Sequence, residues 1–358
     1  MKLFAFTDSW VTNIRRFKEK LSIALDDKTI VEAITSYIKN IPLNFKVIVK
    51  KLKDLRETNY WLGKLHYENG NLPDAIFRFK LLKYFYPNML ELNYLIGRCY
   101  IERNQFKKAS IFINSYLKSN DLHYQIEAKY CYDLINGRTK NITKIPLSIV
   151  KRTFNLLAPK YNSIFLDNTL SPQNEIFKAI NNYVNEISSP FGNKVLDLGC
   201  GTGYIAELLK LNKVASSIQG VDLSPIMISI CSRLQLQNIP CYDQLFEQEI
   251  DVYLSQPSES RFNVIITSKI LNYYSDVQKL ITACKELLLP NGCIAFNYKV
   301  NNEKTLSFDS FFEEFQYSDE FILDLIKTSG LTIHNISEIK FPDGDLGKNV
   351  LLINKQDL

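Results

Sequence analysis

From residue 194 to the C-terminus, short runs of apolar residues alternate with segments in which apolar residues recur every three or four positions. The short runs predict buried strands, and the longer periodic segments predict amphipathic helices. Strands that alternate with helices in this way form a parallel sheet with right-handed crossovers. The runs that predict its strands are residues 194–198, 217–222, 239–242, 262–267 and 293–299.

The last two apolar runs, residues 332–339 and 349–354, are separated only by a short loop that contains proline and glycine. Parallel strands need a crossover of about a dozen residues or more, whereas antiparallel strands need only a tight connection. These two runs therefore predict a terminal antiparallel hairpin. The region as a whole predicts an α/β fold with a seven-stranded sheet.

The N-terminal part of the chain contains an internal repeat. Residues 56–88 align with residues 90–118 at an offset of 34 positions, so that Gly63 meets Gly97 and Ala75 meets Ala109. Small residues at such positions let two antiparallel helices approach closely. The pattern resembles the tetratricopeptide repeat, although His66 replaces the usual aromatic residue and Asp121 replaces the closing proline.

Further helical segments flank the two repeat units. Residues 123–136 predict a capping helix, and residues 8–55 predict amphipathic helix interrupted near Pro42. A repeat stack needs about three units for stability, so we expect these helices to complete it. The resulting plan is a helical domain over residues 1–140, a linker and leading helix over 141–170, and an α/β domain over 171–358.

The amino-acid composition disfavours a membrane protein, a disulfide-rich protein and a metal site. The 358 residues are 46% hydrophobic, which allows two domains with large cores, and no apolar run is long enough to cross a membrane. We therefore expect a soluble, cytoplasmic protein without a membrane partner. Seven scattered cysteines and three histidines indicate neither a disulfide framework nor a metal site.

The net charge of +5 is unevenly distributed. Residues 1–140 hold 24 Lys and Arg against 14 Asp and Glu, while residues 141–358 hold 19 against 24. A basic half can bind an acidic partner or nucleic acid. However, Lys, Asn, Ile, Phe and Tyr are abundant throughout, which favours compositional drift, so nucleic acid is not the expected partner.

Residues 195–203 read Val-Leu-Asp-Leu-Gly-Cys-Gly-Thr-Gly and are followed by a predicted helix from Tyr204. Glycine is required where a chain turns tightly or where a ligand approaches the backbone. A strand that leads through such a loop into a helix N-terminus binds nucleotides in open α/β sheets. The dinucleotide fingerprint requires a third glycine at the position of Tyr204, so a nicotinamide cofactor is disfavoured.

A second strand ends at Asp222, which lies 19 residues after Gly203. An acidic residue about 20 positions beyond the glycine loop binds the ribose hydroxyls of an adenosine cofactor. Ser224 and Pro225 follow as a helix N-cap and first helical residue.

The pattern Asp-Leu-Gly-Cys-Gly-Thr-Gly, followed by Gly-Val-Asp-Leu-Ser-Pro from Gly220, resembles the class I S-adenosylmethionine-dependent methyltransferases. The resemblance implies a Rossmann-like seven-stranded sheet and S-adenosylmethionine as cofactor. Together with the repeats, it is similar to bacterial methyltransferases that carry N-terminal tetratricopeptide repeats, related to the human Williams–Beuren-region methyltransferase. Segments that carry this wider resemblance are residues 150–162, 242–250, 262–273 and 287–292.

The resemblance also implies which residues surround the cofactor. The glycine loop passes the methionine moiety, Asp197 lies near its ammonium group, and Asp222 accepts from both ribose hydroxyls. Leu223 and Ile250 lie against the adenine, Glu249 accepts from its amine, and Tyr161 and Ser268 line the methionine end. The implied cofactor-binding residues are Tyr161, Asp197, Gly199, Cys200, Gly201, Gly203, Asp222, Leu223, Glu249, Ile250 and Ser268.

No catalytic residue is predicted, because a sulfonium is already an activated methyl donor and a general base depends on the acceptor. Tyr161, Tyr273 and Tyr274 are candidates to surround the methyl group, with core packing as the alternative. Two positions depart from the group: Asn162 stands where an Asp follows the aromatic residue, and Lys269 stands where an acid is usual. Lys269 either orients an anionic acceptor or points to water.

Two functions from different classes remain open. The first is methyl transfer to an unidentified small molecule or protein, with the repeat domain binding a protein or peptide. The second is a catalytically silent interaction scaffold, which the departures at Asn162 and Lys269 motivate. A nucleic-acid methyltransferase is a weaker third, because Asn272-Tyr-Tyr-Ser lacks the prolines that base-amine methylation uses.

Overall fold

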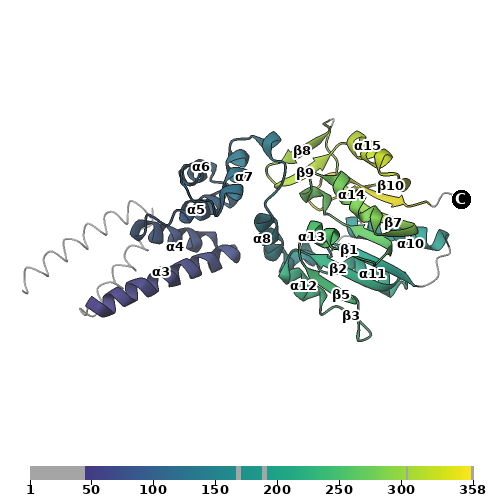
Figure 1. Cartoon of the computed structure of the whole chain (residues 1–358), viewed down its shortest axis with the longest axis horizontal. Helices are drawn as coiled ribbons and strands as arrows, with labels where there is room; N and C mark the ends of the chain where they lie inside the picture. Colours follow the sequence, from purple (N-terminus) through teal and green to yellow (C-terminus); the bar gives the residue numbers. More distant parts are fainter. Residues whose placement is uncertain (1–44, 167–170, 188–191, 304, 356–358) are drawn as a thin grey trace, which may run out of the picture. The chain divides into compact units, whose positions relative to one another are not determined.

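The computed structural model describes residues 45–166, 171–187, 192–303 and 305–355. The chain divides into two compact units, the first ending at Ile135 and the second beginning at Asn136. Figure 1 labels the elements of both units, and each unit is described by itself.

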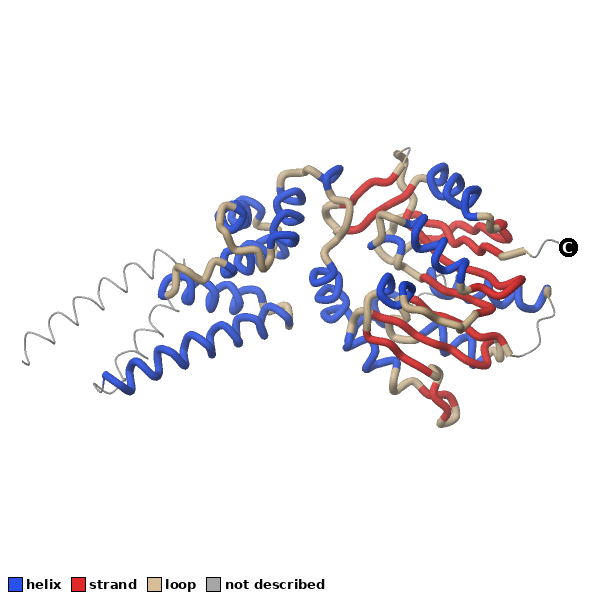
Figure 2. The backbone as a smooth tube through the Cα atoms, viewed as in Figure 1, coloured by secondary structure: helices blue, strands red, loops and turns tan. Residues whose placement is uncertain are grey.

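The first unit is entirely helical over its described residues, and Figure 2 shows its successive helices in blue. Helix α3 packs against α4, α5 packs against α6, and α7 packs against α6. The expected helices before residue 45 lie outside the described residues. The bounds are α3 (Phe45–Glu68), α4 (Leu72–Phe85), α5 (Glu91–Glu102), α6 (Phe106–Leu117) and α7 (Gln125–Ile135).

The two helix pairs of this unit make the same close contact. A Cβ atom added to Gly63 on α3 would lie 2.6 Å from the Phe79 ring, and one added to Gly97 on α5 would lie 2.6 Å from the Ile113 side chain. In each pair the two residues are 16 positions apart, and the second pair lies 34 positions after the first. The small residue in each pair thus lets the partner helix approach, as the aligned sequence positions predict.

The second unit contains a seven-stranded sheet in the order β10-β11-β7-β6-β1-β2-β5. Strands β5, β2, β1, β6 and β7 are parallel, while β11 is antiparallel to both β7 and β10. The predicted seven-stranded α/β fold with a terminal hairpin is confirmed. The strands are β1 (Asn193–Leu198), β2 (Ala215–Asp222), β5 (Gln244–Glu247), β6 (Phe262–Thr267), β7 (Leu288–Lys299), β10 (Thr332–Lys340) and β11 (Leu346–Ile353).

The prediction of a sheet strand at residues 239–242 is wrong. Only Ile239–Pro240 (β4) forms a short pairing, with Gln235–Leu236 (β3), and the sheet strand comes later as β5. Cys241 and Tyr242 are buried although they belong to no strand of the sheet. The Tyr242 ring packs directly on Gly220, so that a Cβ atom added to Gly220 would lie 2.7 Å from the ring. The apolar run therefore indicated burial of side chains rather than a strand.

Three features of the sheet region were not anticipated from the sequence. Strand β7 begins at Leu288 rather than at residue 293, with a register shift opposite β6 between Phe262 and Val264. A separate hairpin of β8 (Leu306–Asp309) and β9 (Glu314–Tyr317) lies between β7 and the following helix. The β10–β11 pairing also contains an irregularity, between Ile333 and Asn335.

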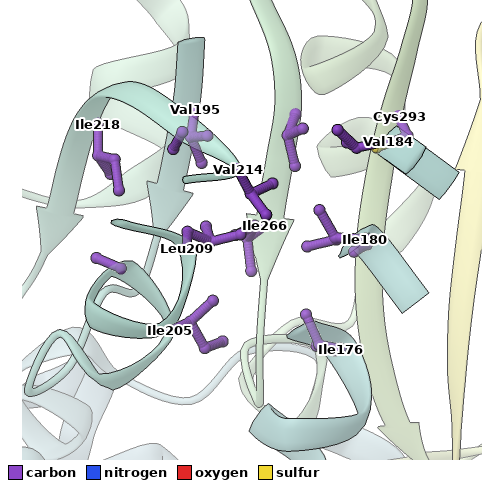
Figure 3. Close-up of a cluster of buried hydrophobic side chains, with 14 of the residues drawn as sticks. Ile176, Ile180, Val184, Val195, Ile205, Leu209, Val214, Ile218, Ile266 and Cys293 are labelled. Carbon is purple, nitrogen blue, oxygen red and sulfur yellow. The ribbon is translucent and has the colours of Figure 1, made fainter. Parts of the chain in front are cut away.

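Helices cover both faces of the sheet, which is why consecutive residues of its central strands are buried. On one face, Ile180 of α10 and Leu209 of α11 meet Val195 and Ile266 of the sheet, as Figure 3 shows. On the other face, α13 contacts α14, which packs against β7 (Figure 1). The helices are α8 (Leu147–Leu157), α9 (Tyr161–Phe165), α10 (Pro172–Glu186), α11 (Tyr204–Leu211), α12 (Pro225–Cys231), α13 (Ile250–Ser255), α14 (Val277–Glu286) and α15 (Asp319–Ser329), with 3₁₀ turns η1 (Thr139–Asn141), η2 (Ala158–Lys160) and η3 (Leu271–Tyr273).

The seven cysteines are all buried, and none of them forms a disulfide bond. In the part of the chain that the structure describes, no helix is long and apolar enough to span a bilayer. Within the same residues, no group of three or more His, Cys, Asp or Glu side chains is arranged to hold a metal ion.

We predict that Ile266→Ala destabilises the sheet unit by about 2–5 kcal/mol, because it removes a fully buried side chain from the central strand β6. Hydrogen exchange of peptides that span β1 and β6 measures the free energy of opening. Val252→Ala, at a side chain that is 46% exposed on α13, is the matched control and should change it by less than about 1 kcal/mol. Equal effects of the two substitutions would contradict this description of the core.

Candidate functional site

The glycine loop joins the end of β1 to the start of α11. The backbone N–H groups of Gly199 and Cys200 both donate to the carbonyl of Val221, at 2.7 and 3.0 Å, so the loop is fixed against the end of β2. Gly199, Gly201 and Gly203 have φ values of 75°, 56° and 85°, a conformation that favours glycine.

The three glycines face different surroundings. A Cβ at Gly199 would lie 2.1 Å from the Ile270 side chain, and one at Gly203 would lie 2.9 Å from Leu234. At Gly201, by contrast, no atom outside the loop backbone lies within 4 Å of the position of a Cβ. Gly201 therefore presents bare backbone to open space, which is the surface that a ligand can approach.

Asp222 ends β2 and connects three segments. One oxygen of its carboxylate accepts from the N–H of Gly201 at 2.9 Å, and the other accepts from the N–H of Ser224 at 2.8 Å. The Ser224 side chain in turn caps α12 by accepting from the N–H of Met227. Burial raises the pKa of Asp222 to about 6, although these backbone donors oppose the rise.

Asp197, near the end of β1, is buried and accepts a hydrogen bond of 2.8 Å from the Tyr242 hydroxyl. Burial raises the pKa of Asp197 to about 7, and the nearby charge of Asp222 adds to the rise, while the Tyr242 bond opposes it. Sequence reasoning missed Tyr242 as part of the site. Tyr242 begins one of the segments that carry the family resemblance, but its apolar run predicted a strand and no contact with Asp197.

A pocket of about 150 Å³ opens at the carboxyl ends of the parallel strands. This is where ligands bind in open α/β sheets. Its walls come from the loops after β1, β2, β5 and β6 and from the chain between Lys144 and Tyr161. The predicted site residues that line it are Tyr161, Gly199, Gly201, Asp222, Leu223, Glu249, Ile250 and Ser268.

A second cavity of about 20 Å³ shares Tyr161, Gly199, Gly201 and Ser268 with the pocket. Asp197 and Cys200 line this smaller cavity, so the structure brings ten of the eleven predicted residues together around the two spaces. Gly203 lines neither space. It packs inward, against Leu234 and Tyr242.

Cys200 faces a second thiol beneath the loop. Its sulfur lies 3.8 Å from that of Cys231, whose thiol donates to the carbonyl of Gly201 at 2.9 Å. The Cys231 contact and burial both raise the pKa of Cys200, so the thiol stays protonated and is a poor nucleophile. Cys200 is therefore a small residue that the loop accommodates rather than a nucleophile.

Side chains of the segment that precedes the sheet bond to the loops at the pocket. Asn162 accepts from the Thr202 hydroxyl at 2.6 Å, and Asn155 of α8 accepts from the Ser224 hydroxyl at 2.7 Å. The Tyr161 hydroxyl accepts from the Gln173 side chain at 3.3 Å. Asn162, which departs from the usual Asp, is therefore joined to the glycine loop, and Asn155 is a contact that the sequence did not reveal.

Glu249 immediately precedes α13, and its carboxylate lies 3.3 Å from the ammonium group of Lys144. Ile250 beside it is buried and faces the pocket. The pair Lys151–Glu247, at 3.0 Å, lies at the end of β5 nearby. These contacts connect the preceding segment to the edge of the sheet that carries β5.

Lys269 follows β6 and lines the pocket with Tyr273 and Tyr274. It is 9% exposed, so the alternative in which it points to water is wrong. The Tyr273 hydroxyl donates to Glu314 at 2.9 Å, and the Tyr273 ring meets Phe154 edge-on. Tyr273 is thus fixed by β9 on one side and by α8 on the other.

The pocket fits a ligand that carries a cation and hydroxyl groups. Asp197 and Asp222 are buried carboxyl groups without a basic partner among the described residues, and Gly201 leaves its backbone accessible. The side-chain oxygen of Gln173, beside Asp197 in the smaller cavity, is buried and has no hydrogen-bond donor among those residues. Buried acceptors of this kind are stabilised when a ligand supplies donors.

Comparisons with known proteins agree with this arrangement. Residues 172–321 match a family described as a methyltransferase domain. The chain is 27% identical over 113 residues to the ubiquinone biosynthesis O-methyltransferase of Pasteurella multocida (strain Pm70), which covers 30% of this chain and 46% of that protein. Its counterpart in Vibrio atlanticus (strain LGP32) is 28% identical over 144 residues, with 40% and 59% covered.

The chain spans about half the length of the curated relatives it matches. Among solved structures, it is similar to magnesium protoporphyrin IX methyltransferase from Synechocystis PCC 6803 with bound SAH. That similarity has a TM-score of 0.46 at 15% identity and covers 58% of this chain and 99% of that one. The family match begins at residue 172, so the helical unit lies outside it. With the seven-stranded order described above, the match shows that the C-terminal part of this chain is a class I S-adenosylmethionine-dependent methyltransferase domain.

Proposed function

We propose that this protein transfers a methyl group from S-adenosylmethionine to an acceptor bound in the same pocket. The observation that carries the proposal is the pair of buried carboxyl groups, Asp197 and Asp222, on either side of a glycine loop whose Gly201 faces open space. Both acids lie at the carboxyl ends of adjacent strands of a methyltransferase domain.

Different residues that line the pocket would contact different parts of the cofactor. Asp222 accepts from the ribose hydroxyls, since a carboxylate has about four lone-pair sites and the backbone N–H groups of Gly201 and Ser224 occupy only part of them. Asp197 and Gln173 accept from the ammonium group of the methionine moiety. The remaining contacts are Leu223 and Ile250 on the adenine, Glu249 toward its amine, and Tyr161, Cys200 and Ser268 along the methionine end.

The cofactor supplies an electrophilic methyl group on a positively charged sulfur. The protein's contribution is to hold the acceptor in line and to exclude water. The rings of Phe154, Tyr161 and Tyr273 line the pocket, and ring faces attract a positive charge. No strong base is required when the acceptor atom is already nucleophilic.

We further propose that the helical unit is a tetratricopeptide-like module that binds a protein or peptide. The equivalent Gly63–Phe79 and Gly97–Ile113 contacts, offset by 34 residues, support this proposal. It extends the resemblance to bacterial methyltransferases with N-terminal repeats and leaves the methyl acceptor unassigned.

A catalytically silent scaffold is the second candidate, motivated by Asn162 and Lys269. Purified protein incubated with methyl-labelled cofactor and fractionated cell extract distinguishes the two. Labelling of a defined small molecule or protein supports methyl transfer. Retained cofactor binding with no labelled product in any fraction supports the scaffold.

We predict that Asp222→Ala weakens S-adenosylmethionine binding about 10- to 100-fold, because hydrogen bonds to a charged group contribute about 1.5–3 kcal/mol. Calorimetric titration measures the dissociation constant, and a thermal melt checks that the variant folds. Asp324→Ala is the matched control, since that side chain is 63% exposed and its ion pair is with Lys327 of the same helix. Unchanged affinity in Asp222→Ala would contradict the assigned role.

We also predict that S-adenosylmethionine binding releases protons at about pH 6.5. In the free protein the pKa of Asp197 is raised to about 7, so the carboxyl is largely protonated there. A bound ammonium group favours the carboxylate, so the pKa falls on binding and the affinity rises as the pH increases through 7. Calorimetry in two buffers with different heats of ionisation counts the protons.

Asp197→Asn is the control for this measurement, because an amide does not titrate. It should remove most of the proton release while keeping the side-chain volume. Proton uptake on binding, or equal release in the variant, would show that Asp197 does not face the ammonium group.

A further inference from the structure

Lys269 is a buried cation whose ammonium group contacts aromatic rings but no carboxylate of the described residues. Only 9% of the residue is exposed. The ammonium nitrogen lies 3.5 Å from the centre of the Phe165 ring and 5.8 Å from that of Tyr161. Among the described residues, Nζ has neither a hydrogen-bond acceptor nor a carboxylate within ion-pair distance.

A ring face attracts the ammonium group but accepts none of its three N–H donors. A buried charge is normally both paired and hydrogen-bonded, because its desolvation is unfavourable. Burial accordingly lowers the pKa of Lys269, and together with the charges of Glu314 and Asp343, which raise it, and of Lys299, which lowers it, brings it to about 8. The site therefore favours a ligand that brings negative charge.

The nearby acids are already engaged with other groups. Glu314 receives the Tyr273 hydroxyl at 2.9 Å and lies 2.8 Å from the ammonium of Lys299. Asp343 and Asp345 lie 2.5 and 3.1 Å from that same ammonium group. These three carboxylates thus form ion pairs with Lys299. Lys269, which lines the pocket, has no ion pair with a described residue.

The backbone holds Lys269 in place at a conformational cost. Its φ is 58°, a left-handed conformation that is unfavourable for a residue with a Cβ. The buried side chain of Asn297 on β7 fixes this turn by accepting from the N–H of Lys269 at 2.7 Å. Strained residues that the surroundings hold firmly cluster at functional sites.

From these observations we propose that Lys269 is the specificity-determining residue of the pocket, and that it binds an anionic oxygen of the methyl acceptor. This inference rests on the proposed function, because the acceptor shares the pocket with the cofactor. A carboxylate or an ionised hydroxyl supplies the acceptors that the ammonium lacks, while apolar side chains such as Ile145 and Phe154 contact the rest of the molecule. The cofactor's sulfonium is positive, so two cations in one pocket also favour an acceptor of opposite charge.

Matched pairs of small probes test this proposal on the full-length protein saturated with S-adenosylhomocysteine. One pair is benzoate and its methyl ester, and the other is 4-nitrophenolate and its methyl ether, 4-nitroanisole. Within each pair the molecules differ mainly in the negative charge. Calorimetric titration at about pH 7.5 gives the affinity of each probe.

We predict that the unmodified protein binds the anionic member of at least one pair about tenfold tighter than the neutral member, equivalent to about 1.4 kcal/mol. Lys269→Met should reduce this ratio to about one, since it keeps the apolar stem and removes the charge. Lys269→Asn, which tolerates the left-handed backbone, should do the same. Lys327→Met is the control for loss of a positive charge, because that side chain is 75% exposed on α15, and it should keep the preference.

The pattern of results separates the possible failures. A preference in the benzoate pair alone supports a carboxylate, and one in the nitrophenolate pair alone supports an ionised hydroxyl. If S-adenosylhomocysteine binds but the charged and neutral probes bind equally, or if Lys269→Met keeps the preference, the inference about Lys269 is overturned and the proposed function stands. If the unmodified protein does not bind S-adenosylhomocysteine, the proposed function fails and this inference fails with it.

Discussion

The carboxylate of Asp222 is the interaction on which the site depends. By accepting from the N–H groups of Gly201 and Ser224, it joins the end of β2 to the glycine loop and to the start of α12. The loop itself returns to the same strand through the two bonds to Val221. The position of the pocket floor therefore follows from the pairing of β1 with β2, because these bonds join the loop and the start of α12 to the end of β2.

The parts of the fold that sequence reasoning predicted share a local cause. The glycine loop, the acid at Asp222 and the terminal hairpin are each encoded within a few consecutive residues, where period and turn chemistry can be recognised. The Gly63 and Gly97 contacts were also predictable, because a repeat places the same packing requirement at a fixed offset.

The parts that sequence reasoning missed depend on contacts between distant residues. Tyr242 is buried because its ring covers Gly220 and its hydroxyl reaches Asp197, which is 45 residues earlier in the chain. The β8–β9 hairpin carries Glu314, whose partners Tyr273 and Lys299 belong to different elements. A polar residue in a hairpin looks the same in the sequence whether it faces water or a buried lysine, so neither contact has a local signal.

The two outer strands of the sheet end it in different ways. Strand β5 has only four residues, so it offers little backbone for another chain to pair with. Strand β10 is longer, but its irregularity between Ile333 and Asn335 interrupts a regular hydrogen-bonding edge, and it carries Glu338 and Lys340. Short, bulged and charged outer strands resist edge-to-edge association. The sheet thus combines a strongly apolar interior with outer strands that offer little regular backbone for edge-to-edge pairing.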